Sequence, residues 1–121
     1  MIKATFKEKD GVFKMKIDGH SGFASKGNDI VCSAASILAC TVGQIVDQAW
    51  INGSLQDKPK IRLREGKGYI ACKPTEDGYL HVREAYKFAE VGFILLAYNY
   101  PQNVDVIMFG MEDKTNERNR A

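Results

Sequence analysis

The feature that most constrains this chain is a stretch from Ile30 to about Trp50 that contains almost no charge; Asp47 is its only acid. Apolar residues recur there at the spacing of one helical face, so the stretch predicts a helix. The face that we expect to pack inward comprises Ile30, Ala34, Ile37, Leu38, Thr41 and Ile45, and it is widened by Val31, Ala35, Val42 and Val46. Because such a helix is apolar nearly all round, we expect a sheet or a second subunit to cover it.

Alternating residues predict two hairpins around this helix. Residues 2–8 and 11–18 flank Asp10-Gly11, a dipeptide typical of tight hairpin turns. In the second of these strands, the apolar residues of the alternation should face the core. Residues 60–64 and 69–73 lie on either side of a glycine-containing turn and predict the second hairpin.

A second helix is predicted from about Tyr79 to Tyr98, and Pro101 ends it before a last strand that contains Val104 and Val106. The apolar stripe of this helix comprises Ala85, Phe88, Ala89, Gly92, Leu95 and Leu96. The resulting order, β-β-α-β-β-α-β, favours an α+β fold with a mostly antiparallel sheet and two helices. We expect one domain over residues 1–111 and a flexible polar tail over 112–121.

The charge and apolar content of the chain limit the classes of function that it can have. The excess of two positive charges over 121 residues does not by itself indicate a nucleic-acid-binding protein, so we do not expect a nucleic-acid partner. We expect no apolar run to approach the roughly 20 residues of a membrane span, and the first residues lack the pattern of a signal peptide. We therefore expect a cytoplasmic protein without a membrane partner. The sheet edges and the apolar helix favour a homodimer.

The cysteines do not form the pattern of a metal site. Cys32, Cys40 and Cys72 are odd in number and include no CxxC pair, which indicates free thiols in a reducing compartment. Together with His20 and His81, they have spacings that do not suit zinc. We expect neither a metal nor another cofactor.

The reactive side chains meet at the junction of a loop and the first helix. His20 stands at the entrance of the glycine-containing loop 19–28, and Cys32 follows in the first helical turn. Free backbone N–H groups and the helix dipole favour a thiolate there and could form an oxyanion hole. His20 could accept the thiol proton, and Asp29 could cap the helix, orient His20, or do both.

Simpler structural roles remain open for the same residues. Cys32 could be a small core residue, as buried cysteines often are, and Asp29 could act only as an N-cap. Ser36, one turn after Cys32, could simply fill a helical position. Cys40 and Cys72 are most simply core residues, and His81 a surface residue.

The motif Gly19-His20, followed by Gly27-x-Asp29-Ile30-Val31-Cys32-x-Ala34-x-Ser36-x-Leu38, resembles the signature of the ribosomal-processing cysteine protease family Prp. The resemblance implies that His20 and Cys32 form a catalytic dyad that Asp29 and Ser36 support. It also implies a homodimer that removes the N-terminal extension of a large-subunit ribosomal protein during ribosome assembly. Phage relatives imply a second substrate class, phage structural precursors.

The chain departs from the family pattern at Ser21 and Ser33, where alanine is usual. Both residues are small, so the dyad is unaffected, but the loop that contains Gly22, Phe23 and Gly27 should shape the substrate cleft. The leading hypothesis is therefore a cysteine endopeptidase with an unidentified protein substrate. The alternative is a non-enzymatic, dimeric ribosome-assembly module that binds RNA, which the Lys and Arg residues of 58–64 would favour.

Overall fold

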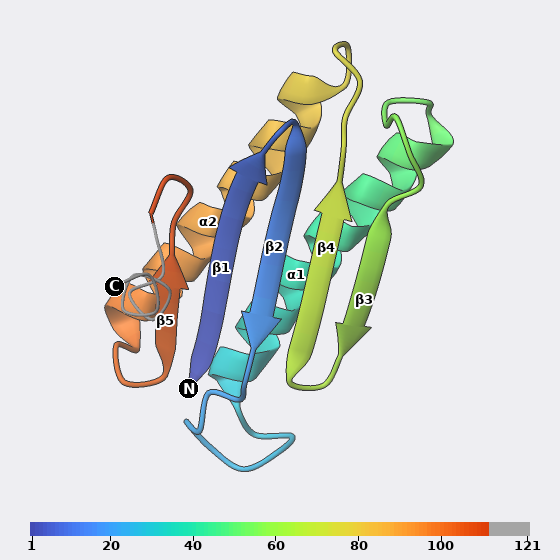
Figure 1. Ribbon diagram of the computed structural model, residues 1–121. Helices are drawn as coiled ribbons and strands as arrows, with labels where there is room; N and C mark the ends of the chain where they lie inside the picture. Colours follow the sequence, from blue (N-terminus) through green and yellow to red (C-terminus); the bar gives the residue numbers. More distant parts are fainter. Residues whose placement is uncertain (112–121) are drawn as a thin grey trace, which may run out of the picture.

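The computed structural model describes residues 1–111, which form a five-stranded sheet with both helices on one of its faces (Figure 1). The elements are β1 (Ile2–Lys9), β2 (Val12–Asp18), α1 (Ile30–Ile51), β3 (Lys60–Arg64), β4 (Lys67–Cys72), α2 (Tyr79–Asn99) and β5 (Val104–Ile107). The predicted α+β fold and its order of elements are confirmed. The predicted tail, 112–121, lies outside the described residues.

The sheet has the strand order β3-β4-β2-β1-β5. Its strands pair antiparallel except for β1 and β5, which run parallel. The first hairpin turns at Asp10 and Gly11, whose φ angles are 53° and 78°, as a two-residue turn between twisted strands requires. Phe13, Met15 and Ile17 of β2 are buried, so the predicted inward face of this strand is confirmed.

The inward faces predicted for the two helices are confirmed in part: Val31, Ala35, Val42 and Val46 of α1 and Ala85 and Ala89 of α2 are buried, but four bulkier residues are not. Ile30 and Ile37 of α1 are 59% and 64% exposed, and Phe88 and Leu95 of α2 are 71% and 58% exposed. The buried residues of the two helices are Val31, Ala35, Ala39, Val42, Gly43, Val46 and Ala49 of α1 and Val82, Ala85, Tyr86, Ala89, Glu90 and Phe93 of α2. Both helices carry apolar residues on more than one face, so periodicity alone does not determine which face meets the sheet.

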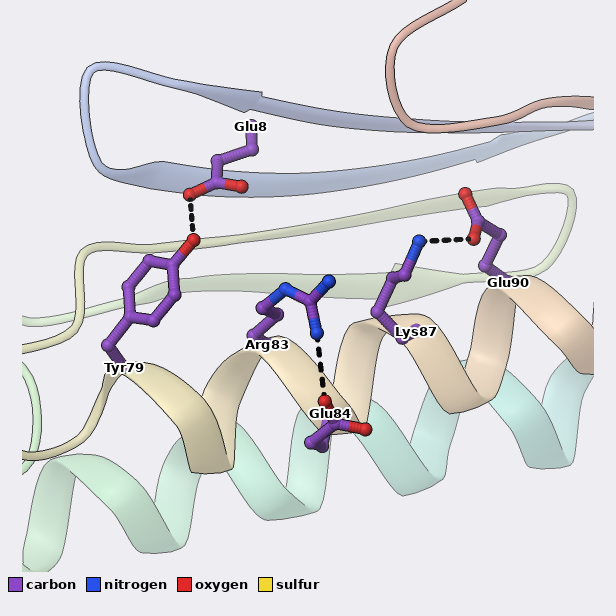
Figure 2. Close-up of polar contacts among 6 residues, drawn as sticks. All are labelled: Glu8, Tyr79, Arg83, Glu84, Lys87 and Glu90. Carbon is purple, nitrogen blue, oxygen red and sulfur yellow. Dashed lines mark hydrogen bonds and ion pairs between the residues drawn. The ribbon is translucent and has the colours of Figure 1, made fainter.

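Helix α2 is fixed along the sheet by polar contacts as well as by its core residues (Figure 2). At its first turn, the Tyr79 hydroxyl donates a 2.7 Å hydrogen bond to Glu8 of β1, which raises the pKa of Tyr79. Further along, the buried Glu90 accepts a 2.7 Å hydrogen bond from the Phe109 N–H and lies 3.3 Å from the Lys87 ammonium. These contacts join α2 to β1 and to the chain that follows β5.

By length and composition, α1 could cross a membrane, contrary to the expectation that no apolar run approaches that length. About a third of its most apolar window (33%) is buried inside the protein. The buried face contributes Val31, Val42 and Val46 to the same core as the sheet. The composition of α1 is therefore explained by a core helix whose outer face is also apolar.

Candidate active site

The chain leaves β2 through Gly19, and this turn directs it toward the end of the β3–β4 hairpin. Gly19 has a φ of +95°, and the Met1 carbonyl oxygen occupies the place that a Cβ would take. Its N–H donates a 2.9 Å hydrogen bond to the Gly66 carbonyl in the hairpin turn. Glycine is therefore required here on two grounds, backbone angle and space, and His20 emerges beside the hairpin.

The Asp29 carboxylate organises the loop and the start of α1. Its Oδ1 accepts a 2.9 Å hydrogen bond from the Cys32 N–H, which is the N-cap interaction. Its Oδ2 accepts hydrogen bonds from the Ser21 hydroxyl and, at 3.3 Å, from the Ala24 N–H. The Ser21 hydroxyl, followed by the backbone N–H groups, lowers the pKa of Asp29 to about 2 although burial opposes the shift. The carboxylate is therefore ionised at neutral pH.

Cys32 lies half-buried in the first turn of α1. Its Sγ accepts a 3.4 Å hydrogen bond from the Ser21 N–H, so the residue after His20 directly contacts the thiol. The N–H of Cys32 is bonded to the Asp29 side chain, and that of Ser33 to the Asp29 carbonyl at 3.1 Å. These two amides are thus occupied in this structure and do not form the expected oxyanion hole.

A cleft of about 950 Å³ brings the predicted site residues together. The loop and α1 contribute His20, Gly22, Gly27, Asp29, Cys32 and Ser36, and the β3–β4 hairpin contributes residues 63–68. Phe23, predicted to belong to the substrate loop, does not line this cleft. Its ring packs edge-on against Tyr100, with 5.2 Å between the ring centroids.

His20 and Cys32 share the cleft without touching through a hydrogen bond. The imidazole is exposed and lies against the hairpin turn, where a Cβ placed on Gly66 would be 2.7 Å from Nε2. Within residues 1–111, the imidazole makes no hydrogen bond to the thiol. Catalytic hydrogen bonds are often formed only when substrate is bound, so this arrangement is compatible with a dyad.

The sequence interpretation did not identify three residues that hold the site together. Ser21 appeared only as a small replacement for alanine, yet it is 2% exposed and contacts both Asp29 and Cys32. Asn103, just before β5, donates a 2.8 Å hydrogen bond from its side chain to the Ser21 carbonyl. Gly66 supports the imidazole. Asn103 and Gly66 are far from the motif in sequence, so no local signal identifies them.

A comparison of the sequence with models of protein families identifies the family of this chain. A family model described as cysteine protease Prp matches residues 1–105. The chain belongs to the Prp family of cysteine proteases. Within residues 1–111, no three His, Cys, Asp or Glu side chains are grouped as a metal site would require.

Solved structures include several with the Prp fold. One is the essential ribosomal processing protease Prp from S. aureus, in complex with a covalently linked product peptide. It is 22% identical to this chain, the superposition covers 90% of this chain and 99% of the S. aureus chain, and the TM-score is 0.64. SMU.848 from Streptococcus mutans is 27% identical to this chain. The superposition covers 90% of this chain and 95% of the Streptococcus chain, and the TM-score is 0.60. Comparison with curated protein sequences found no match. The chain is thus a cysteine protease of the Prp fold.

Replacing Gly66 by alanine tests the support of His20. An added Cβ would displace the imidazole, and the φ of +75° would strain alanine by about 1 kcal/mol. On the expectation that His20 is catalytic, kcat for peptide cleavage should fall roughly 10- to 100-fold, because a misplaced catalytic group loses much of its effect. Steady-state kinetics and the NMR signals of His20 measure the two consequences.

Gly53→Ala is the matched control for this experiment. Gly53 has the same φ of +75° and has no atom within 4 Å of an added Cβ. Both variants should therefore lose similar stability, while only Gly66→Ala loses kcat. Equal activity in the two variants would show that contact with the hairpin turn does not position His20.

Asp29 should make stability depend on pH in the acid range. Its pKa is 3.8 ordinarily and about 2 in the folded protein, so the ionised carboxylate stabilises the fold above about pH 4. That contribution is lost as the pH falls toward about 2. Ser21→Ala removes the largest cause of the shift, so the pKa of Asp29 in the folded variant should rise toward 3.8, and the acid loss of stability should be smaller and end at higher pH. Urea unfolding between about pH 2 and about pH 5, with NMR titration of Asp29, measures this.

Ser36→Ala is the matched serine control for the acid titration. Ser36 lies in the same cleft but makes no hydrogen bond to Asp29 among the described residues. This variant should titrate as the unmodified protein does. If Ser21→Ala also left the pKa of Asp29 unchanged, the serine hydroxyl would not be the cause of its low value.

Proposed function

We propose that Cys32 and His20 form the catalytic dyad of this protease. Cys32 attacks the scissile carbonyl, while His20 takes the thiol proton and then donates it to the leaving amine. Water, deprotonated by His20, then hydrolyses the thioester and restores the thiol. The observation that carries the proposal is a half-buried thiol at a helix start, in a cleft whose wall also contains the only nearby imidazole among residues 1–111.

Ser21 and Asp29 act on the dyad through the thiol. The Ser21 N–H donates to Sγ, so it would stabilise the negative charge of a thiolate, as would the N-terminal end of α1. The Asp29 carboxylate fixes both the helix start and the Ser21 hydroxyl. Asp29 makes no hydrogen bond to His20 within the described residues, so we assign it a positioning role. Ser36, one turn further along α1, is available to contact the substrate.

The tip of the loop can separate from the β3–β4 hairpin at little energetic cost. The tip is joined to the hairpin by an ion pair between Lys26 and Glu65, 3.3 Å apart with side chains 84% and 61% exposed. Such exposed pairs contribute about 0–1 kcal/mol, so an incoming peptide can separate them. Gly22 and Gly27, both with positive φ, would serve as flexible points in this movement.

We propose a ribosomal protein precursor in the cytoplasm as the substrate. The similar S. aureus protein is a ribosomal processing protease, and its structures contain a product peptide in one case and a substrate peptide in another. The resemblance of residues 19–38 to the Prp signature implies that the segment removed is the N-terminal extension of a large-subunit ribosomal protein. Phage structural precursors are the second substrate class. Membership of a protease family leaves the non-enzymatic assembly module without support.

The assignment is tested with a large-subunit ribosomal protein precursor that carries its N-terminal extension. The unmodified protein should release one peptide, identified by mass spectrometry, and Cys32→Ala should reduce the rate at least about 1000-fold because it removes the nucleophile. Cys40→Ala, which removes an exposed thiol farther along the same helix, should still cleave. Cleavage by Cys32→Ala at the normal rate would refute the dyad. Cleavage of a phage precursor alone would reassign the substrate.

We further propose a homodimer formed through the helices. Their outer face exposes Ile30, Ile37, Ile51, Leu80, Phe88, Val91, Leu95 and Tyr98. This layer is not covered by any described element, and an apolar patch of this extent is typical of protein interfaces (Figure 1). Packing of two such faces would remove these side chains from water.

Light scattering after size-exclusion chromatography tests the dimer. The unmodified protein should have twice the mass of one chain, and Phe88→Glu should give the single-chain mass because it places a charge in the apolar contact. Met108→Glu is the control, since Met108 is 38% exposed but follows β5 rather than lying on a helix. A single-chain mass for the unmodified protein at micromolar concentration would exclude a stable dimer.

A further inference from the structure

The sheet face that carries no helix gathers much of the positive charge of the chain. Side chains alternate along strands, and the buried residues point toward the helices, so their neighbours point outward. The exposed cations of this outer face, the basic sheet face, are Lys7, Lys9, Lys14, Lys16, Lys60, Arg62, Arg64 and Lys67. The face is turned toward the viewer in Figure 1. A net charge of +2 conceals this segregation, because the acids lie largely elsewhere.

The register of the strands brings four of these cations together around one aromatic ring. Lys16, Tyr69 and Arg62 are paired in one row across β2, β4 and β3. Two residues further along the same strands, Asp18, Lys67 and Arg64 form a second row. The two rows surround a hollow of about 250 Å³, with Tyr69 half-buried in it.

The charge of the hollow is largely uncompensated. Lys16 pairs with Asp18 at 3.6 Å, and Asp18 is the only acid in the lining. Within residues 1–111, Arg62, Arg64 and Lys67 have no ion-pair partner. A concave site with exposed guanidinium and ammonium groups attracts an anionic partner, and guanidinium groups in particular match phosphate.

We propose that the basic sheet face binds single-stranded nucleic acid. Phosphates contact Arg62, Arg64 and Lys67, and one base stacks on Tyr69. A sheet face with cations around a half-buried aromatic ring suits unpaired bases, whose faces are open for stacking. An acidic polypeptide would satisfy the cations equally but would make no use of the ring. The observations therefore favour nucleic acid.

The hollow adjoins the catalytic cleft. Arg64, Lys67 and Gly68 line both, because the end of the β3–β4 hairpin separates them. A nucleic acid bound on the basic sheet face would thus reach the rim of the cleft. This arrangement suits a protein substrate that is presented on nucleic acid. The binding itself does not depend on the proposed dyad, so it can be tested without any cleavage.

Fluorescence anisotropy with a labelled single-stranded RNA of about 12 nucleotides tests the inference, with single-stranded DNA of the same sequence as a second probe. We expect affinity to fall with salt. Arg62→Gln should weaken binding about two- to fivefold and reduce the salt slope by about 0.7, as expected for one lost phosphate contact. Arg83→Gln is the matched control, because it removes a cation from α2 that pairs with Glu84 (Figure 2).

Two further substitutions separate charge from stacking. Asp18→Asn removes the single acid of the hollow and should tighten binding. Tyr69→Leu should weaken it at least about fivefold, whereas Tyr69→Phe retains the ring and should bind normally. A variant that only loses its fold would bind more weakly in every case, so tighter binding by one variant and weaker binding by another indicates a specific site. Circular dichroism checks that each variant is folded.

Three outcomes would overturn the inference. The first is absence of binding to either oligonucleotide at about 50 mM salt, where phosphate contacts are strong. The second is equal weakening by Arg62→Gln and Arg83→Gln, which would indicate attraction by net charge alone. The third is a polyglutamate peptide of equal charge that binds as tightly as RNA and is insensitive to Tyr69→Leu, which would assign the face to an acidic protein.

Discussion

The rest of the site depends on the interaction between the Asp29 carboxylate and the start of α1. The carboxylate accepts hydrogen bonds from both the N–H of Cys32 and the hydroxyl of Ser21. Because Ser21 also contacts the thiol and Asn103, a single ionised group joins the loop, the start of α1 with Cys32, and the entry to β5. Capping therefore has two effects here: it stabilises a helix end and determines where the thiol stands relative to the cleft.

The two layers of the fold serve different interactions. The helices contribute their small and β-branched residues to the core and leave an apolar outer face, whereas the sheet leaves a basic one. The cleft lies where the layers meet at one end, between the loop, α1 and the β3–β4 hairpin. A second subunit would approach the helices on one side of the sheet, and a polyanion the other side. The cleft and the hollow of the basic sheet face share Arg64, Lys67 and Gly68, so substrate and polyanion would meet at the end of the β3–β4 hairpin.

The motif 19–38 was sufficient to predict the family, and the structure brings its His20, Cys32 and Asp29 to one cleft. The alternation of β2 and the Asp10-Gly11 turn likewise predicted their structure, since these signals are local. The helix faces were not predictable in the same way. Ile30 and Ile37 are more apolar than Ala35 and Ala39, yet the alanines face the sheet. A helix can pack closely where its side chains are small. Hydrophobicity alone therefore does not predict which face is buried, because it takes no account of side-chain size.

The sequence by itself determined the order of the elements, the glycine-dependent turns and the positions of a histidine at the loop entrance and a cysteine at a helix start. Each depends on backbone preferences or on residues close in the chain. Only the tertiary structure decided that Gly66 supports the imidazole and that Asn103 holds Ser21. It alone gathered Arg62, Arg64 and Lys16 around Tyr69. Strand register brings these groups together across long separations in the chain, and register is a property of the assembled sheet.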